Sequence, residues 1–210
     1  DAFMQALRKL CDEHGIVLIA DEIQSGFGRT GRFFASEYAG IEPDLLTTAK
    51  GIAGGYPLAA VVGKADIMDA PLPGGLGGTY AGSPVGCSAA LAVLDVMDTE
   101  GLVRRASDIG QRVKTRLLAL QKEHPGVIGE IRADRGAMIA MELVQDGDAS
   151  KPLADMTKAL VAKAYEKGLV LLSCGINGNV IRLLPALTIE NEILDEGMAI
   201  LADCVAEVAA

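Results

Sequence analysis

Apolar residues in the first hundred positions switch between helical and strand-like spacing. Phe3, Leu7, Leu10 and Cys11 lie on one face of a helix that Gly15 would end. Residues 16–20 are all apolar, which is typical of a fully buried parallel strand, and Asp21 stands at the carboxyl end of that strand. The pattern then predicts a glycine-rich loop to Gly31, a short helix over 33–39, strands over 44–48 and 58–63, and a helix from Ser83-Pro84 to Gly101. This order predicts an α/β fold with a site along the carboxyl ends of its strands.

The pattern changes after Gly101. Apolar residues at Ile109, Val113, Leu117 and Leu120 predict an amphipathic helix, and residues 137–144 predict a strand. A helix over 153–167, strands over 169–173 and 180–184, and a last helix over 190–208 complete a smaller α+β unit. We therefore expect two domains, 1–101 and 102–210.

Composition excludes several classes of function. The chain has 210 residues, with 19 Lys and Arg against 28 Asp and Glu, and this acidic balance disfavours nucleic acid and anionic membranes as partners. The longest uncharged stretch, residues 70–94, contains six Gly and three Pro, which excludes a membrane-spanning helix there. The four Cys and two His lack the spacing of a zinc site or a disulfide framework, so we expect reduced thiols, no metal and a cytoplasmic protein. Because the chain starts at Asp1, directly on a helical pattern, we expect a fragment that begins inside a domain.

Lys50 is the one charged residue between Leu45 and Gly63. Most lysines are solvated surface charges, but a lysine in apolar surroundings loses its proton more readily and becomes a nucleophile. Glycines on both sides of Ile52-Ala53 would let the backbone approach a ligand closely. These features indicate a lysine that forms a Schiff base.

The acids Asp21 and Glu22 allow three interpretations. They form a strand-end turn, bind magnesium, or provide an acid that pairs with a buried cation. The magnesium interpretation lacks the G-x-x-x-x-G-K-[ST] loop that would hold phosphates. Residues 26–31 match G-x-G-x-x-G, but five residues, two of them acids, separate this match from the strand, which disfavours dinucleotide binding. The turn and the cation partner remain open.

Further candidate residues lie on either side of Lys50. Six of the eight aromatic residues fall between positions 27 and 80, which packing alone explains or which suits a pocket for a flat ring. Residues 74–80, Gly-Gly-Leu-Gly-Gly-Thr-Tyr, are either a flexible loop or a set of amides and a hydroxyl for an anion such as phosphate. Arg182 has apolar neighbours on a predicted strand, so we expect its guanidinium to meet a carboxylate from the protein or from a substrate.

Together these motifs resemble the class III aminotransferases, which use pyridoxal 5′-phosphate (PLP) on the fold type I scaffold. The resemblance is carried by residues 21–31 (Asp-Glu-Ile-Gln-Ser-Gly-Phe-Gly-Arg-Thr-Gly), by Lys50 with the Gly-Gly-Tyr-Pro tail at 54–57, and by Gly-Gly-Thr-Tyr at 77–80. It covers essentially the whole chain. It implies that residues 1–101 are the C-terminal part of the large PLP-binding α/β domain and that residues 102–210 are the small C-terminal α+β domain.

The resemblance also implies a role for each matching residue. Lys50 would form the internal aldimine with PLP and move the proton between substrate and cofactor. Asp21 would pair with the pyridinium nitrogen and keep it protonated, so that the ring withdraws electrons from the reacting carbon. Ile23 would pack on the ring face, and Gln24 would hydrogen-bond the 3-oxygen. Thr79 would bind the cofactor phosphate of the partner subunit in a homodimer, and Arg182 would bind the substrate α-carboxylate.

Residues 73–82, 136–143 and 171–175 are most similar to the 4-aminobutyrate branch of this family, and the ornithine and acetylornithine branches are close. The implied reaction moves an amino group from 4-aminobutyrate, the small-molecule donor, to the 2-oxo acid 2-oxoglutarate. In the family a further half precedes the matching segment, and it supplies the main phosphate-binding turn and the aromatic residue that stacks on the ring. The alternative is therefore a catalytically silent, truncated chain.

Overall fold

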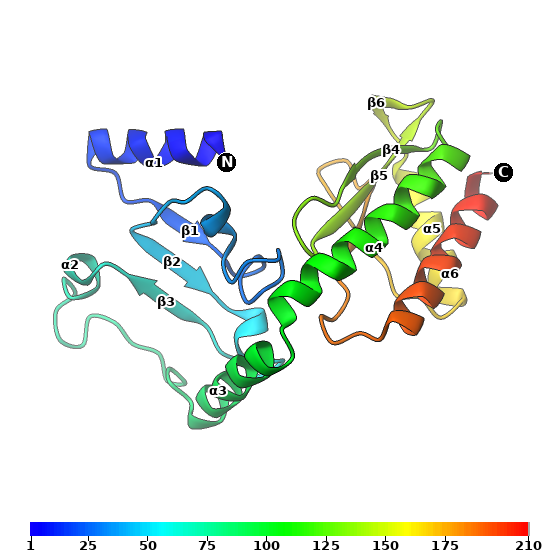
Figure 1. Cartoon of the computed structure of the whole chain (residues 1–210). Helices are drawn as coiled ribbons and strands as arrows, with labels where there is room; N and C mark the ends of the chain where they lie inside the picture. The colour runs from blue at the N-terminus through cyan, green and yellow to red at the C-terminus, as the bar shows by residue number, and fades with distance from the viewer. Residues whose placement is uncertain (210) are drawn as a thin grey trace. The chain divides into compact units, whose positions relative to one another are not determined.

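The computed structural model describes residues 1–209 and divides the chain into two compact units, Asp1–Arg104 and Arg105–Ala210 (Figure 1). The division follows Arg104, close to the boundary expected after residue 101. Each unit has its own sheet and its own helices. Within residues 1–209 no helix is both long and apolar enough to cross a bilayer.

The first unit is built on a three-stranded sheet with the strand order β1-β2-β3. Strand β1 (Ile19–Asp21) runs parallel to β2 (Leu45–Thr48), and β3 (Ala60–Gly63) runs antiparallel to β2. The helices are α1 (Ala2–His14), the 3₁₀ helices η1 (Ala35–Tyr38) and η2 (Lys50–Ala53), α2 (Ala65–Met68) and α3 (Pro84–Thr99). Because β1 and β2 are parallel, their carboxyl ends lie at one edge of the sheet.

The strand expected over residues 16–20 is shorter and less buried than its apolar sequence indicates. Strand β1 begins at Ile19, and Ile16, Val17 and Ile19 are each about half exposed, whereas Leu18 is buried. In the sheet order β1 is an edge strand with β2 as its neighbour. A fully buried parallel strand needs a neighbour on each side and cover on both faces. The prediction of full burial was therefore wrong.

The Asp44 side chain, directly before β2, forms hydrogen bonds with three other parts of the first unit. Its carboxylate accepts hydrogen bonds from Leu18 N (2.7 Å), Lys64 Nζ (2.7 Å) and Arg8 Nη1 (2.8 Å). The Leu18 amide, followed by the two cations, holds the pKa of Asp44 well below its ordinary value. Helix α1, the residue before β1 and the residue after β3 are thereby connected through one side chain.

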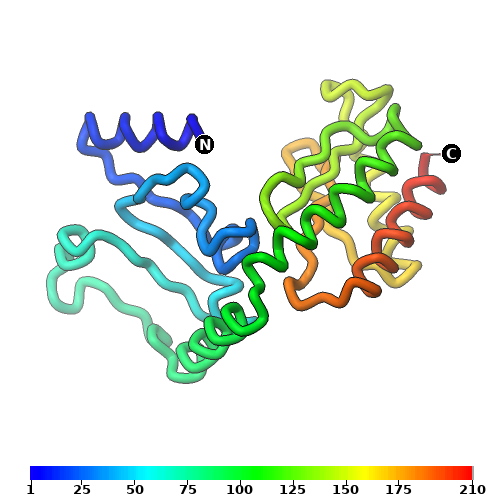
Figure 2. Tube along the Cα trace, in the orientation of Figure 1, coloured from blue at the N-terminus to red at the C-terminus, as the bar shows by residue number. Residues whose placement is uncertain are grey.

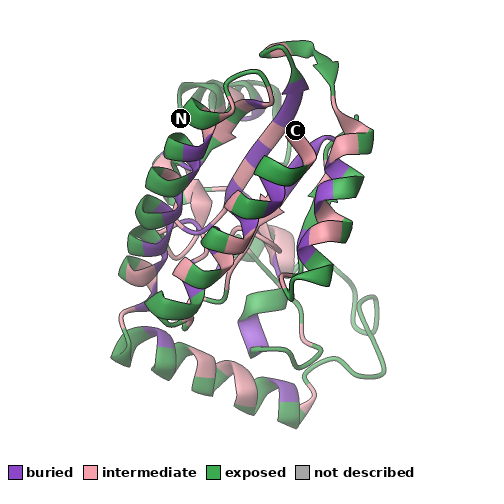
Figure 3. Ribbon diagram, turned by 90° about the vertical axis from the view of Figure 1, so that its right-hand side faces the viewer, coloured by how far each residue is buried: buried purple, intermediate pink, exposed green. Residues whose placement is uncertain are grey.

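Residues 69–82 connect α2 to α3, and they are exposed throughout, without a helix or strand (Figures 2 and 3). Helix α3 begins at Pro84, directly after Ser83, as the sequence predicts. Its residues Val85 and Leu91 are more than half exposed. The first unit therefore presents apolar surface on both its edge strand and its last helix.

The second unit contains an antiparallel sheet with the strand order β4-β5-β8-β7, and β6 pairs with β5. Its strands are β4 (Ile128–Arg132), β5 (Ile139–Gln145), β6 (Asp148–Pro152), β7 (Leu172–Cys174) and β8 (Val180–Leu183). Its helices are α4 (Leu102–Glu123), which begins shortly before the boundary at Arg105, α5 (Ala154–Glu166) and α6 (Asn191–Ala209).

These three helices pack on one face of the sheet (Figure 1). The four apolar residues of α4 expected to face the core, Ile109, Val113, Leu117 and Leu120, are all buried, so the predicted helix is confirmed. On β5, Ile139, Met141 and Leu143 join the same core, while Ala140 and Glu142 alternate toward the other face. That other face carries the polar residues discussed below.

Two strands of the second unit were missed in the sequence. The apolar residues of β4, Ile128 and Ile131, are three apart because an irregularity in the ladder falls between them, which breaks the period of two. Strand β6 is polar and short, and its signal is the Asp146-Gly147 turn after β5, where both residues have positive φ angles of 54° and 72°. Such Asp-Gly turns are typical of tight hairpins.

Candidate functional site

Asp21 and Lys50 lie at the same edge of the first sheet. Asp21 is the last residue of β1 and pairs with Thr47 of β2, and Lys50 begins η2 two positions after β2 ends at Thr48. Since β1 and β2 are parallel, both residues come from carboxyl strand ends. This is the edge at which the sequence pattern predicts a site.

The Asp21 carboxylate keeps an unused acceptor. Its Oδ1 accepts a hydrogen bond from Ile23 N at 3.1 Å and a longer one from Thr47 Oγ1 at 3.4 Å. Its Oδ2 takes part in none of the hydrogen bonds formed within residues 1–209, and the residue is exposed. Of the two interpretations left open, the strand-end turn is formed through Oδ1, and the pairing of Oδ2 with a cation remains a prediction.

Lys50 is exposed, so residues 1–209 do not form the apolar surroundings expected from the sequence. Its backbone has φ = 50°, a left-handed conformation that non-glycine residues rarely adopt. The next residue, Gly51, packs tightly against Phe27, because a Cβ at position 51 would lie 3.2 Å from Cβ of Phe27. Phe27 has φ = 54°, so it also adopts the left-handed conformation.

The loop after β1 is held by Glu22, which is 3% exposed. Glu22 Oε2 accepts hydrogen bonds from Ser25 Oγ (2.5 Å) and Ala35 N (3.0 Å), and Oε1 accepts one from Ser36 N (2.7 Å). These bonds close the segment that contains Ile23 and Gln24, both half-buried. The sequence pattern does not separate the roles of Asp21 and Glu22, although consecutive residues at a strand end point to opposite sides.

The aromatic residues near the site fall into two groups. The rings of Phe27, Phe33 and Phe34 pack on one another, with centroids 4.9 to 6.2 Å apart. Tyr56 and Tyr80 are exposed at 56% and 87% and do not join them. Packing therefore explains the three phenylalanines. The G-x-G-x-x-G match at 26–31 lies in this loop and is followed by the four-residue 3₁₀ helix η1, not by the long helix of a dinucleotide site.

Thr79 lies in the exposed segment 69–82, and neighbouring Gly77 has no atom within 4 Å of a Cβ built on it. Within residues 1–209 Thr79 forms no hydrogen bond with Asp21, whose partners are Ile23 and Thr47. The exposure of this segment leaves the Thr79 hydroxyl accessible from outside.

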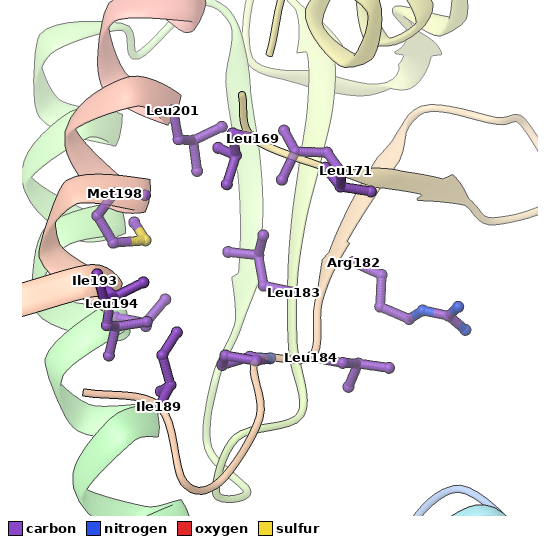
Figure 4. A pocket seen from close by; sticks show the side chains of 14 residues that line it. Leu169, Leu171, Arg182, Leu183, Leu184, Ile189, Ile193, Leu194, Met198 and Leu201 are labelled. Atoms are coloured by element: carbon purple, nitrogen blue, oxygen red, sulfur yellow. The ribbon is translucent and has the colours of Figure 1, made fainter. Parts of the chain in front are cut away.

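Arg182 lies on β8 of the second unit, opposite Ala140 of β5 and Leu172 of β7. Its guanidinium points away from Leu183 and the apolar residues of α6, toward the sheet face that the helices leave open (Figure 4). Its Nε is buried without a hydrogen-bond partner, and no ion pair to Arg182 forms within residues 1–209. The sequence predicts that Arg182 meets a carboxylate either from the protein or from a substrate. Residues 1–209 do not supply the first.

Behind Arg182, the helix side of the sheet contains a cavity of about 240 Å³ between β8 and α6. Its lining is apolar apart from Arg182, and it includes Leu169, Leu183, Ile189, Leu194 and Met198 (Figure 4). Within residues 1–209 no group of three or more His, Cys, Asp or Glu side chains forms a metal site.

Comparison with known proteins gives one consistent family. The family model described as "Aminotransferase class-III" matches residues 1–205. The chain is 58% identical over 203 residues to the 4-aminobutyrate aminotransferase GabT of Escherichia coli K12, covering 97% of this chain and 47% of that protein. It is 55% identical over 208 residues to the 5-aminovalerate aminotransferase DavT of Pseudomonas aeruginosa, covering 99% of this chain and 48% of that protein.

Two solved structures that superpose on this chain are also aminotransferases. An aminotransferase of Bacillus anthracis superposes with a TM-score of 0.90 at 31% identity, over 98% of this chain and 48% of that one. The acetylornithine aminotransferase of Elizabethkingia anophelis superposes with a TM-score of 0.83 at 33% identity, over 98% of this chain and 51% of that one. The expected α/β fold of the PLP-dependent transferases is confirmed, and the chain spans about half the length of the relatives it matches.

Proposed function

Because the chain belongs to the class III aminotransferase family, we propose that it supplies the lysine, the acid and a substrate arginine of a PLP-dependent aminotransferase. The proposed reaction converts 4-aminobutyrate and 2-oxoglutarate to succinate semialdehyde and glutamate. The observation that carries this proposal is the placement of Asp21 and Lys50 at the carboxyl ends of two adjacent parallel strands. The identity of 58% to a 4-aminobutyrate aminotransferase supports the choice of substrates.

The residues of the first unit fit the cofactor. PLP supplies a cationic ring that accepts the electrons released when a bond to the substrate amino carbon breaks. Asp21 Oδ2, which accepts no hydrogen bond within residues 1–209, would hold the proton on the ring nitrogen. Lys50 would attach the cofactor through Nζ and then carry a proton. Ile23 and Gln24, on the loop that Glu22 closes, would contact the ring face and the 3-oxygen.

Arg182 would bind the α-carboxylate of glutamate and 2-oxoglutarate. A guanidinium presents two parallel donors that match a carboxylate, and Arg182 has no carboxylate partner within residues 1–209. A partly buried guanidinium without an anionic partner costs free energy, and a substrate carboxylate would supply that partner.

We further propose a cytoplasmic homodimer. Thr79 lies on an exposed segment, where a second subunit's cofactor phosphate has access to its hydroxyl. The four cysteines are free thiols, and Cys87 is exposed, which suits a reducing compartment.

A second amino donor, 5-aminovalerate, is favoured by the 55% identity to DavT. It differs from 4-aminobutyrate by one methylene, a difference that pockets discriminate weakly. Ornithine- and acetylornithine-type activity has less support, because the corresponding solved structures are near 30% identical. A chain without turnover of its own is the remaining alternative, supported by the exposed apolar residues Ile16, Val17 and Ile19.

The test joins the chain to the preceding half of E. coli GabT and compares this chimera with the 210-residue chain alone. We expect the chimera to transaminate 4-aminobutyrate with 2-oxoglutarate, and the chain alone to bind PLP weakly without turnover. In the chimera, Lys50→Ala should abolish activity, whereas Lys151→Ala, a matched change on the exposed hairpin strand β6, should not. A folded, PLP-loaded chimera that prefers acetylornithine, or that keeps activity without Lys50, would contradict the proposal.

A further inference from the structure

The open face of the second sheet places two arginines in one row across three strands. Arg132 of β4 pairs with Ala140 of β5, and Ala140 pairs with Arg182 of β8. Directly paired residues project to the same face, so Arg132 and Arg182 flank the small side chain of Ala140. Their electrostatic surroundings differ, because Arg132 is paired with acids and Arg182 is not.

Glu142 is the acid nearest to Arg182 in the register. It lies two positions after Ala140 on the same face of β5 and pairs with Val180. Glu142 and Arg182 are therefore diagonal neighbours, a separation that long side chains span. Nevertheless they form no ion pair.

Other contacts hold the Glu142 carboxylate. Its Oε2 lies 4.0 Å from Arg132 Nη1, and its Oε1 accepts a hydrogen bond from Asn179 Nδ2 at 3.4 Å. Asn179 is 2% exposed and is itself fixed, since its Nδ2 also donates to Leu143 O at 2.9 Å. Arg132 additionally pairs with Glu130. Glu130 and Glu142 are thus both drawn toward Arg132.

From this arrangement we propose that Arg132 is a positioning residue that keeps Glu142 away from Arg182 and so leaves Arg182 available to a substrate carboxylate. The inference rests on the proposed function of Arg182. Without the charge of Arg132, Glu142 would be free to pair with Arg182, its diagonal neighbour, and this internal ion pair would then compete with the substrate. Arg132 would set substrate affinity without touching the substrate.

The test measures how fast phenylglyoxal modifies Arg182 in the intact chain, by mass spectrometry of its peptides. Arg132→Gln should slow modification of Arg182 about fivefold, the factor that corresponds to ~1 kcal/mol for a partly exposed ion pair. The double variant Arg132→Gln/Glu142→Gln should restore the parent rate. Arg132→Lys, which keeps the charge, and Glu142→Gln alone should leave it unchanged. Arg112, held on two nitrogens by Asp195, provides the reference for a paired arginine in every sample.

Arg132 lies on an edge strand with its side chain 46% exposed, so its replacement leaves the core intact, and Arg132→Met serves as a second variant. Equal rates at Arg182 in Arg132→Gln, Arg132→Met and the parent would overturn the inference. A separate measurement tests the proposed function: glutarate should protect Arg182 in the parent chain. Failure of glutarate to protect would reject the substrate role of Arg182, whatever the rates in the Arg132 variants.

Discussion

Gly110 of α4 lies against the carbonyl oxygen of Gly136 so closely that a Cβ at position 110 would clash with it. Helix α4 and the turn before β5 therefore touch backbone to backbone. Gly197, within α6, is different, because a Cβ there would meet Leu169 Cδ1 at an ordinary 3.5 Å beside the apolar cavity.

These two glycines make a matched pair for a stability measurement. Gly110→Ala should destabilise the chain by about 1–3 kcal/mol, because neither backbone segment can give way without moving others. Gly197→Ala should stabilise it by about 0.5–1 kcal/mol, since alanine restricts the unfolded chain and its methyl group makes an ordinary contact with Leu169. Urea unfolding of both variants measures the difference, and shifts of the same sign would contradict it.

Asp44→Asn should lower the melting temperature of the first unit. Arg8 and Lys64 would lose their anionic partner, and the Leu18 amide would donate to a neutral, weaker acceptor. The folded-state pKa of Asp44 is lowered, so its stabilising contribution is complete above the ordinary value near 3.8 and is lost as the pH falls further. The melting difference between parent and variant should therefore be constant near neutral pH and shrink below about pH 4. A melting difference that grows on acidification would show that the Asp44 carboxylate does not stabilise the folded state.

Lys50 should be the lysine that PLP labels. Its side chain is exposed at the carboxyl edge of the sheet, whereas Lys64 is tied to Asp44 at 2.7 Å. Incubation of the chain or the chimera with PLP, borohydride reduction and peptide mapping should place the pyridoxyl group on Lys50. Asp21→Asn in the chimera should leave this label in place but slow the half-reaction by orders of magnitude, since an ion pair to the ring nitrogen becomes a neutral contact. A label mainly on another lysine would remove Lys50 from the site.

Glu22→Gln should loosen the loop that carries Ile23 and Gln24. Its amide replaces a carboxylate that accepts from Ser25, Ala35 and Ser36, so at least one donor faces another donor at a cost of about 1–3 kcal/mol. Hydrogen exchange at the Ala35 and Ser36 amides should accelerate. Glu37→Gln, which affects the exposed bond to Phe34 N, is the control and should leave Ser36 protected. Unchanged exchange at Ser36 in Glu22→Gln would show that the loop is held by other contacts.

The sequence by itself determined the elements whose signal is local. Helix α4 follows from Ile109, Val113, Leu117 and Leu120, because a helical period places these residues on one face whatever they pack against. The motif around Lys50 and the acid Asp21 likewise predict a site from the sequence, since the expected chemistry depends on residue type and order. Strand β4 was missed because its ladder irregularity breaks the period of two that identifies a strand.

Tertiary structure alone decided the rest. The exposure of Ile16, Val17 and Ile19 depends on β1 being an edge strand, which no property of those residues encodes. The role of Glu22 depends on the fold bringing the amides of Ala35 and Ser36 within hydrogen-bonding distance of its carboxylate. Within residues 1–209, the absence of an ion pair between Glu142 and Arg182 depends on a register that puts Ala140, not Glu142, directly opposite Arg182. Pairing between distant segments is a non-local energy, summed over the whole sheet, so it becomes visible only when the segments are assembled.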